Sequence, residues 1–150
     1  MEEYKDIDQI LSNLYLGNRD AASDEEILEE RNITHILVMG HRMEPTFPDK
    51  YTYKTCLLDD DETENIDIFF ETGIEFIEEC LNQGGSILVH CWMGISRSAT
   101  MVSAYLMKTN KSWTGDKTIE WLKEKRPCVN PNPGFREQLM KFEESGCKFN

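Results

Sequence analysis

The chain has 150 residues, a formal net charge of −12 at pH 7 and an isoelectric point near 4.6. This length suffices for one domain with a sizeable hydrophobic core, so residues 1–150 are predicted to form a single domain. The strong negative charge argues against a nucleic-acid-binding protein and against a membrane-surface protein, because both present a basic face to an anionic partner.

The N-terminus and the apolar runs indicate neither export nor membrane insertion. Met1–Asp6 has no basic start and no apolar core of the kind found in a signal peptide. No run approaches about 18 consecutive apolar residues, the length that spans a bilayer. We therefore expect a cytoplasmic protein, with the nucleus as a second compartment.

The cysteines are odd in number, and no two of them form a Cys-x-x-Cys pair. They are Cys56, Cys80, Cys91, Cys128 and Cys147. This pattern fits neither a zinc site nor a disulfide framework, so no metal site is expected. All but Cys91 are predicted to be small buried residues in a reducing compartment, and Cys91 is set apart by its neighbours.

Short apolar runs dominate the first half of the chain and indicate strands. Ile10–Leu11 and Leu14–Gly17 predict a short strand or a strand pair that ends at a glycine turn. Ser23–Leu28 predicts a short helix, because a capping residue and first-turn acids precede its apolar residues. Ile33–Met39 predicts a buried strand, and the alternation over Tyr51–Leu58 predicts another.

Helical spacing dominates the second half. Apolar residues recur at helical intervals over Asn65–Leu81, which predicts a core-facing helix that stops at Gly84–Gly85. Ser86–Val89 predicts the central strand. Three further helices are indicated, the first by Met101, Val102, Tyr105 and Leu106, the second by Ile119, Trp121 and Leu122, and the third over Pro133–Gly146. The alternation predicts an α/β fold, with a central, mostly parallel sheet of about five strands flanked by helices on both faces.

The segment His90–Ser98 connects the predicted strand Ser86–Val89 to the next helix. A loop in this position can turn its backbone N–H groups toward one point, which makes a site for a tetrahedral anion. Gly94 allows the tight reversal, and Arg97 carries a planar fork of donors suited to two phosphate oxygens. The residues expected to bind phosphate are Trp92, Met93, Gly94, Ile95, Ser96 and Arg97.

Cys91 stands at the start of this loop, where the field that holds an anion also stabilises a thiolate. It is therefore the candidate nucleophile. Ser98 is expected to donate its hydroxyl to the sulfur, and His90 is expected to orient the loop through hydrogen bonds without touching substrate. An anion site with a nucleophile directed into it indicates phosphate-ester chemistry through a phosphocysteine.

Such a mechanism needs a proton donor for the departing oxygen. Acidic residues follow the predicted strand Tyr51–Leu58 and reach the same sheet edge as the Cys91 segment. They are Asp59, Asp60, Asp61, Glu62 and Glu64. A solvated acidic turn is the expected role for all but one of them, and spacing alone does not choose the acid.

The chain resembles the catalytic domain of dual-specificity protein phosphatases, within the cysteine-dependent protein tyrosine phosphatase superfamily. Val89–Cys91, Gly94–Thr100 and Ala104–Met107 are similar to the family's signature and the helix that follows it. Leu14–Gly17 and Asn130–Phe135 also resemble family landmarks, so the similarity covers nearly the whole chain. The resemblance implies a protein phosphatase that acts through a phosphocysteine and needs no metal or organic cofactor.

The resemblance also implies roles for two further residues. In the family the general acid is an aspartate followed five residues later by an asparagine, and Asp60 and Asn65 share this spacing. Asp60 is therefore the expected acid. Asp59 and Asp61 are alternatives, because this chain has adjacent aspartates where the family usually has one. Asn132 is expected to brace the phosphate-binding segment by hydrogen bonding rather than to contact substrate.

Family-like residues begin near Leu14, so no rhodanese-like kinase-docking domain is expected and the chain resembles the small, atypical members. No segment resembles the recognition loop that deepens the pocket of tyrosine-specific relatives. The resemblance therefore implies substrates with phosphotyrosine, phosphoserine or phosphothreonine. The expected partner is a phosphorylated protein, with a protein kinase as one candidate, and the oligomeric state is left open.

Two alternative functions stay open. One is a phosphatase of the same fold that acts on phosphoinositides or RNA 5′-phosphates, which the uncharged Trp92, Met93 and Ile95 disfavour. The other is a non-catalytic module that binds phosphoproteins, which the presence of Cys91 disfavours. Separately, Cys56 is a candidate to form a disulfide with an oxidised Cys91, although a buried structural thiol is its favoured role.

Overall fold

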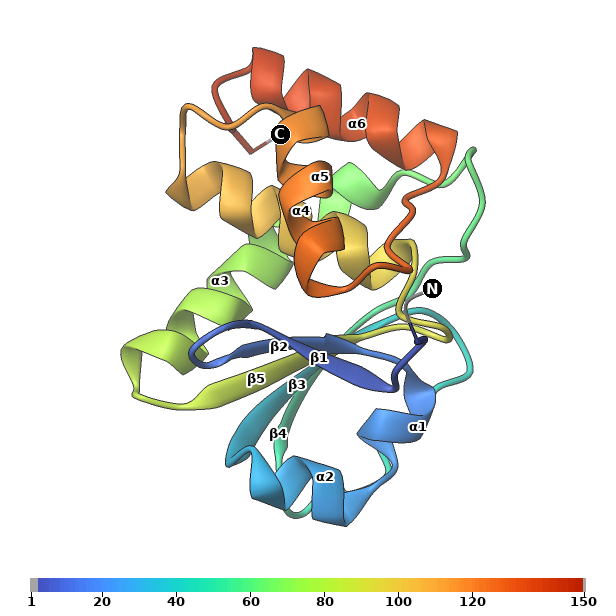
Figure 1. Cartoon of the computed structure of the whole chain (residues 1–150), viewed down its shortest axis with the longest axis vertical. Coiled ribbons are helices and arrows are strands. Elements are labelled where there is room, and N and C mark those ends of the chain that lie inside the picture. The colour runs from blue at the N-terminus through green and yellow to red at the C-terminus, as the bar shows by residue number, and fades with distance from the viewer. Residues whose placement is uncertain (1–2, 150) are drawn as a thin grey trace.

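A five-stranded sheet forms the centre of the computed structural model, which describes residues 3–149 (Figure 1). Its strands are β1 (Ile7–Leu11), β2 (Leu14–Gly17), β3 (Ile33–Met39), β4 (Thr52–Cys56) and β5 (Ser86–His90). In space they follow the order β1-β2-β5-β3-β4. The pairing of β1 with β2 is antiparallel, and the other pairings are parallel. The prediction of a mostly parallel sheet is confirmed.

The central strand β5 lies between β2 and β3. All of its residues are buried, as expected for a strand whose two faces are both covered by helices. Val89 pairs with Leu16 of β2 on one side and with Leu37 of β3 on the other. Because these parallel strands share a direction, the segments that follow β4 and β5 leave the sheet at the same edge, where ligands bind in α/β sheets.

Helices cover both faces of the sheet (Figure 1). On one face lie α1 (Arg19–Ala22) and α2 (Glu25–Glu30). On the other lie the 3₁₀ turn η1 (Ile66–Phe69), α3 (Phe70–Asn82), α4 (Arg97–Thr109), α5 (Gly115–Lys125) and α6 (Pro133–Glu144). The helix α4 packs against α3, α5 and α6, and its residues 98–107 are all buried. Within residues 3–149, no helix is both long and apolar enough to cross a membrane.

Some element boundaries differ from the sequence prediction. The helix predicted over Asn65–Leu81 begins as the 3₁₀ turn η1 and becomes α-helical one turn later. The strand predicted over Tyr51–Leu58 is shorter in the structure, where β4 spans Thr52–Cys56. This strand lies at the edge of the sheet, and most of its residues are partly or fully exposed. The helix α1 is absent from the prediction, since four residues are too few to show a helical period.

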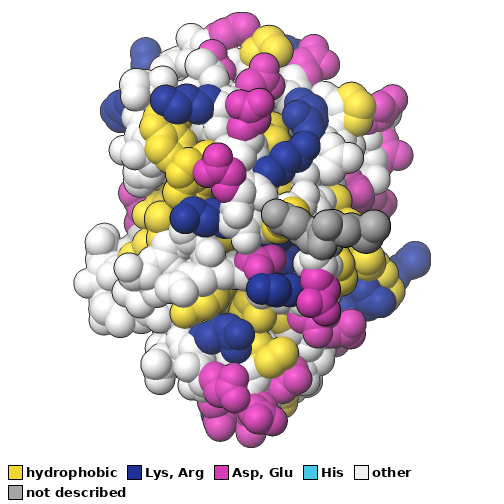
Figure 2. Space-filling model, viewed as in Figure 1, with side chains coloured by type: hydrophobic (Ala, Val, Ile, Leu, Met, Phe, Trp, Pro, Cys, Tyr) yellow, Lys and Arg dark blue, Asp and Glu magenta, His cyan; other side chains and the backbone are white. Residues whose placement is uncertain are grey.

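The negative charge of the chain is spread unevenly over its surface. Figure 2 shows acidic side chains gathered at the end of the molecule that α2 forms. This helix contributes Glu25, Glu26, Glu29 and Glu30. Attraction for an anionic ligand must therefore come from local groups rather than from the overall charge.

Candidate active site

The loop between β5 and α4, named here the Cys91 loop (Cys91–Arg97), lies where the central strand meets the most buried helix. Cys91 is buried, with 2% of its surface exposed, directly after the last residue of β5. Trp92 and Met93 are 46% and 41% exposed, and the guanidinium of Arg19 lies over the Trp92 ring, 3.9 Å from its centroid. The loop therefore combines a buried thiol with two exposed, uncharged side chains.

Successive backbone carbonyls of the Cys91 loop accept hydrogen bonds from residues outside the loop. Arg19 Nη1 donates to Trp92 O at 2.9 Å, Tyr4 Oη to Met93 O at 2.7 Å, Arg126 Nε to Gly94 O at 2.8 Å and Asn130 N to Ile95 O at 2.8 Å. In a planar trans peptide the C=O and the following N–H point in opposite directions. Holding these carbonyls outward therefore directs the N–H groups of residues 93–96 to the inner side of the loop, where they can bind an anion.

Gly94 is the residue at which this loop needs glycine. Its φ is +70°, a conformation that side-chain-bearing residues rarely adopt. A Cβ atom there would lie 2.5 Å from Gly17 O and 2.6 Å from Arg126 Nη2. The tight reversal and the close approach to β2 both depend on the missing side chain.

The thiol of Cys91 has a hydroxyl beside it. Its Sγ lies 3.1 Å from Oγ of Ser98, which is fully buried in the first turn of α4. The hydroxyl can donate to a thiolate, and the N-terminus of α4 adds partial positive charge. The pair is suited to stabilise a sulfur anion.

The guanidinium of Arg97 reaches from the Cys91 loop to the segment that follows β4. Its Nη1 donates to Leu58 O at 3.1 Å, at the end of the segment that follows β4. Its Nε is buried and has no hydrogen-bond partner among the described residues. A buried N–H without a partner is costly, so this donor points to an anionic ligand that would satisfy it.

His90 is the last residue of β5 and is 3% exposed. Burial, with a smaller contribution from the charge of Arg97, lowers the pKa of His90 to about 4. Its Nδ1 lies 3.2 Å from the carbonyl oxygen of Cys91. The ring is therefore neutral at pH 7 and is placed to orient the start of the loop.

Asn132 connects the Cys91 loop to the acidic loop (Asp59–Glu64). Its backbone N donates to Ser96 Oγ at 3.0 Å, and its side-chain Nδ2 donates to Asp60 Oδ1 at 2.9 Å. Its Oδ1 caps α6 by accepting from Phe135 N at 2.9 Å. Asn132, which is itself fixed at a helix N-terminus, therefore bridges Asp60 and the Cys91 loop.

The two neighbours of Asp60 have different surroundings. Asp61 Oδ1 accepts from Thr63 Oγ1 at 2.6 Å and from Thr63 N at 2.7 Å, and these bonds lower the pKa of Asp61. Asp59 lines a hollow with His41, Arg42 and Trp92. Asp61 is thus held as an anion within its own turn, which suits a structural role better than proton donation.

The fold and the loop geometry place this chain among known proteins. The family model described as "Dual specificity phosphatase, catalytic domain" matches residues 14–145. The chain belongs to the dual-specificity phosphatase family.

Relatives of this dual-specificity phosphatase cover nearly all of its length. Dual specificity protein phosphatase 1 of Arabidopsis thaliana is 43% identical over 136 residues, 91% of this chain and 68% of that protein. The crystal structure of DUSP15 has a TM-score of 0.89 at 37% identity, covering 95% of this chain and 90% of the other. The human tyrosine phosphatase-like serine/threonine/tyrosine-interacting protein has a TM-score of 0.88 at 35% identity, covering 93% and 96%. The predicted fold class and enzyme family are confirmed.

The thiol of Cys56 has surroundings that differ from those of Cys91. None of its five cysteines is in a disulfide. Burial raises the pKa of Cys56 to about 11, so this thiol is protonated at neutral pH. A protonated, 1% exposed thiol fits a structural role better than attack on an oxidised Cys91.

Several residues that hold the Cys91 loop of this phosphatase are absent from the sequence prediction. Tyr4, Arg19 and Arg126 contact it across 89, 73 and 32 sequence positions. No local pattern marks such contacts. The one available signal is that Arg126 is a charged residue in the turn that leads to the predicted landmark Asn130–Phe135.

Proposed function

We propose that this chain hydrolyses phosphotyrosine and phosphoserine or phosphothreonine in proteins, through a phosphocysteine formed on Cys91. The observation that carries the proposal is a buried thiol beside the Ser98 hydroxyl, at the base of a loop with inward N–H groups and an unpartnered Arg97 Nε. Residues 1–150 form one catalytic domain in this proposal.

In the first step the Cys91 thiolate attacks phosphorus in line with the ester bond. The S–P bond forms, the P–O bond breaks, and Asp60 gives its proton to the departing oxygen. Arg97 and the loop N–H groups hold the other phosphate oxygens and stabilise the charge of the transition state. These groups supply the positive charge that the reaction needs from the protein.

In the second step water attacks the phosphocysteine. The Asp60 carboxylate takes a proton from the water, the S–P bond breaks, and inorganic phosphate leaves. The sulfur departs as a thiolate, to which Ser98 donates a hydrogen bond. The starting protonation states of Cys91 and Asp60 are restored.

The rim of the loop favours protein substrates. Trp92 and Met93 are exposed and uncharged, and the guanidinium of the neighbouring Arg19 is already engaged by the Trp92 carbonyl and ring, which disfavours the several phosphates of a phosphoinositide headgroup. The net charge of −12 also disfavours RNA and anionic membranes. A phosphorylated protein is the proposed partner, with a kinase as one candidate.

The free cysteines favour a reducing compartment for this activity. We therefore propose the cytoplasm as its location, with the nucleus as a second compartment.

A panel of phosphotyrosyl, phosphoseryl and phosphothreonyl peptides, assayed beside phosphoinositides and RNA 5′-phosphates, tests the substrate class. Wild type is expected to release phosphate fastest from the peptides, and Cys91→Ser to bind them without turnover. Faster release from a phosphoinositide or an RNA end would contradict the protein-substrate proposal. Binding of peptides by wild type without hydrolysis would indicate a non-catalytic module instead.

A further inference from the structure

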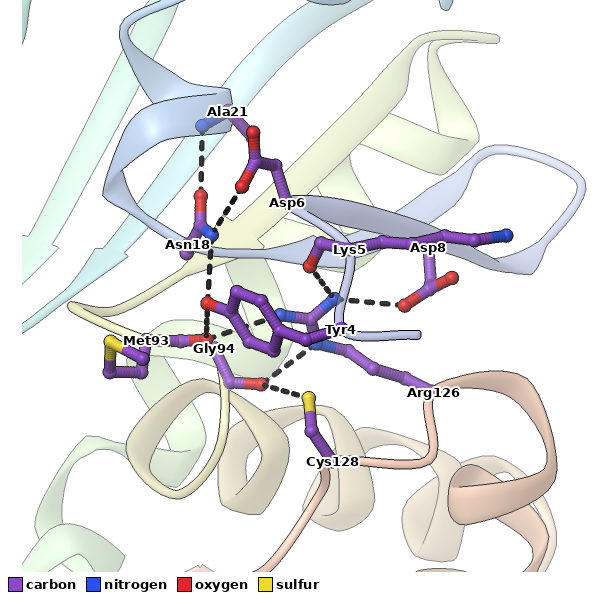
Figure 3. A network of polar contacts seen from close by, with 10 residues as sticks. All are labelled: Tyr4, Lys5, Asp6, Asp8, Asn18, Ala21, Met93, Gly94, Arg126 and Cys128. Atoms are coloured by element: carbon purple, nitrogen blue, oxygen red, sulfur yellow. Dashed lines mark hydrogen bonds and ion pairs between the residues drawn. The ribbon is translucent and has the colours of Figure 1, made fainter. Parts of the chain in front are cut away.

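Arg126 is a fully buried cation that the proposed chemistry does not use. It follows the last residue of α5, and its guanidinium lies between the N-terminal segment and the Cys91 loop (Figure 3). Its Nε donates to Gly94 O at 2.8 Å, and its Nη2 donates to Met93 O at 3.1 Å. One planar guanidinium therefore binds two successive carbonyls of the loop.

The other side of the same guanidinium binds the N-terminal segment. Arg126 Nη1 donates to Lys5 O and to Asp8 Oδ2, both at 2.8 Å. Asp8 lies in β1, and its side chain is 13% exposed. Because an unpaired buried charge is strongly destabilising, Asp8 is what allows a guanidinium to occupy this place.

Tyr4 binds one of the same two carbonyls from the N-terminal segment (Figure 3). Its hydroxyl donates to Met93 O at 2.7 Å and accepts from Asn18 Nδ2 at 2.8 Å. Asn18 is itself fixed, because its Oδ1 accepts from Ala21 N at the start of α1. The tyrosine proton is thereby directed to the loop.

We propose that Arg126 is a positioning residue for phosphate binding, held by Asp8 and assisted by Tyr4. Each carbonyl that it binds shares a peptide plane with the next N–H, so Arg126 sets the direction of the Gly94 and Ile95 N–H groups. A cation on the carbonyl side also polarises these peptides and strengthens their N–H groups as donors. Tyr4 and Asp8 lie before residue 14, outside the part of the chain that the family model matches.

The proposal rests on the proposed function only for the identity of the anion, so its test measures anion binding without turnover. Tungstate, a tetrahedral dianion, is titrated calorimetrically into the Cys91→Ser protein. Adding Arg126→Met is expected to raise Kd about tenfold, equivalent to about 1.4 kcal/mol of binding free energy. Arg126→Lys restores the charge but not the planar fork, so its Kd is expected between those of the parent and of Arg126→Met.

Tyr4→Phe provides a variant that keeps the buried charge. It removes only a hydroxyl from a side chain that is 42% exposed, and its Kd is expected to rise about threefold, the effect of one neutral hydrogen bond. Leu28→Ala is the control for general destabilisation, because Leu28 is a fully buried residue of α2, a helix that packs against α1 and β3. Its Kd for tungstate is expected to equal that of the parent.

Folding of each variant is checked by denaturant unfolding before titration. A tungstate Kd that Arg126→Met leaves unchanged would overturn the proposal. If Arg126→Met does not fold, unchanged Kd values for Arg126→Lys and Tyr4→Phe would overturn it equally. If wild type fails to hydrolyse phosphopeptides while these variants weaken tungstate binding, the proposed function fails and the positioning role stands.

Discussion

Asn132 donates a hydrogen bond from Nδ2 to Asp60 Oδ1 at 2.9 Å while its backbone N donates to Ser96 Oγ at 3.0 Å. Asn132 thus contacts both the acidic loop and the Cys91 loop. Its own position is set by its role as the N-cap of α6. The relative placement of Asp60, the proposed proton donor, and the loop of Cys91, the proposed nucleophile, is therefore built on a helix terminus.

Asp60→Asn is expected to slow hydrolysis of an alkyl phosphate peptide by about 100-fold, because the departing alkoxide loses its proton donor. The decline in rate that wild type is expected to show at high pH should also be absent from Asp60→Asn, since an amide does not ionise. Steady-state rates measured across pH with a phosphothreonyl peptide check both effects.

The neighbouring carboxylates provide matched controls in the same loop. Asp61→Asn and Asp59→Asn change the same charge, and Asp61 is already held as an anion by Thr63. Both variants are expected to keep the decline at high pH. Loss of that decline in either of them, with Asp60→Asn unaffected, would move the acid to the other residue.

Gly134→Ala tests whether the acidic loop must pack closely on α6. A Cβ at Gly134 would approach the backbone of Glu62, with its carbonyl carbon at 2.7 Å. The acidic loop is expected to shift, lowering kcat by about tenfold to 100-fold while the Kd for tungstate stays unchanged. At Gly115 a Cβ would meet Leu139 Cβ at an ordinary 3.5 Å, so Gly115→Ala should change neither value. Equal losses of kcat in both variants would refute the role of this contact.

His90 should make stability depend on pH below neutrality. Its folded-state pKa of about 4 lies below the ordinary value of 6.5, so the unfolded chain binds more protons between these pH values. The stabilisation is complete above pH 6.5 and is lost as pH falls toward 4, by about 3 kcal/mol in total. Urea unfolding of wild type and His90→Asn at several pH values measures this difference.

His90→Asn is expected to lose less stability than wild type over this range. His41→Asn serves as the control, because His41 is an exposed residue outside the Cys91 loop. It should retain the wild-type decline. An identical decline in wild type and His90→Asn would show that the buried imidazole does not control the response.

Ser98→Ala should slow the breakdown of the phosphocysteine more than its formation, because the departing thiolate loses a hydrogen bond. The expected loss is about tenfold to 100-fold, the range for a hydrogen bond to a charged group. Stopped-flow assays with para-nitrophenyl phosphate should then show a burst of nitrophenolate before a slow steady rate. Ser103→Ala, which removes a buried hydroxyl bonded to Ala99 O in the same helix, should show no such burst. A burst of equal size in both variants would count against a contact with the sulfur.

Most of the fold could be predicted because its elements carry strong local patterns. The buried strand Ile33–Met39 and the apolar spacing over Asn65–Leu81 are clear in the sequence, and β3 and α3 occupy these places. The 3₁₀ turn η1, which precedes α3, could not be predicted, since its apolar residues fit either kind of helical turn. The short α1 depends on a cap from Asn18, a single contact with no periodic signature.

Cys91 and Arg97, the proposed nucleophile and phosphate-binding residue, could be predicted to share one loop because they are neighbours in sequence. The groups that shape the loop could not, since Tyr4 and Arg126 reach it from opposite ends of the chain. The sequence predicts that Asn132 braces the loop, but the bond of Asn132 to Asp60 depends on how α6 meets the acidic loop. Such contacts are decided by tertiary packing, which no spacing in one chain reports.

Trapping of the covalent intermediate tests the central claim most directly. Wild type is mixed briefly with a phosphotyrosyl peptide carrying radiolabelled phosphate, denatured at once, digested and mapped. The label is expected on the peptide that contains Cys91 and to be absent from Cys91→Ser. Hydrolysis of the substrate with no label on the protein, or label on a residue other than Cys91, would contradict a phosphocysteine mechanism.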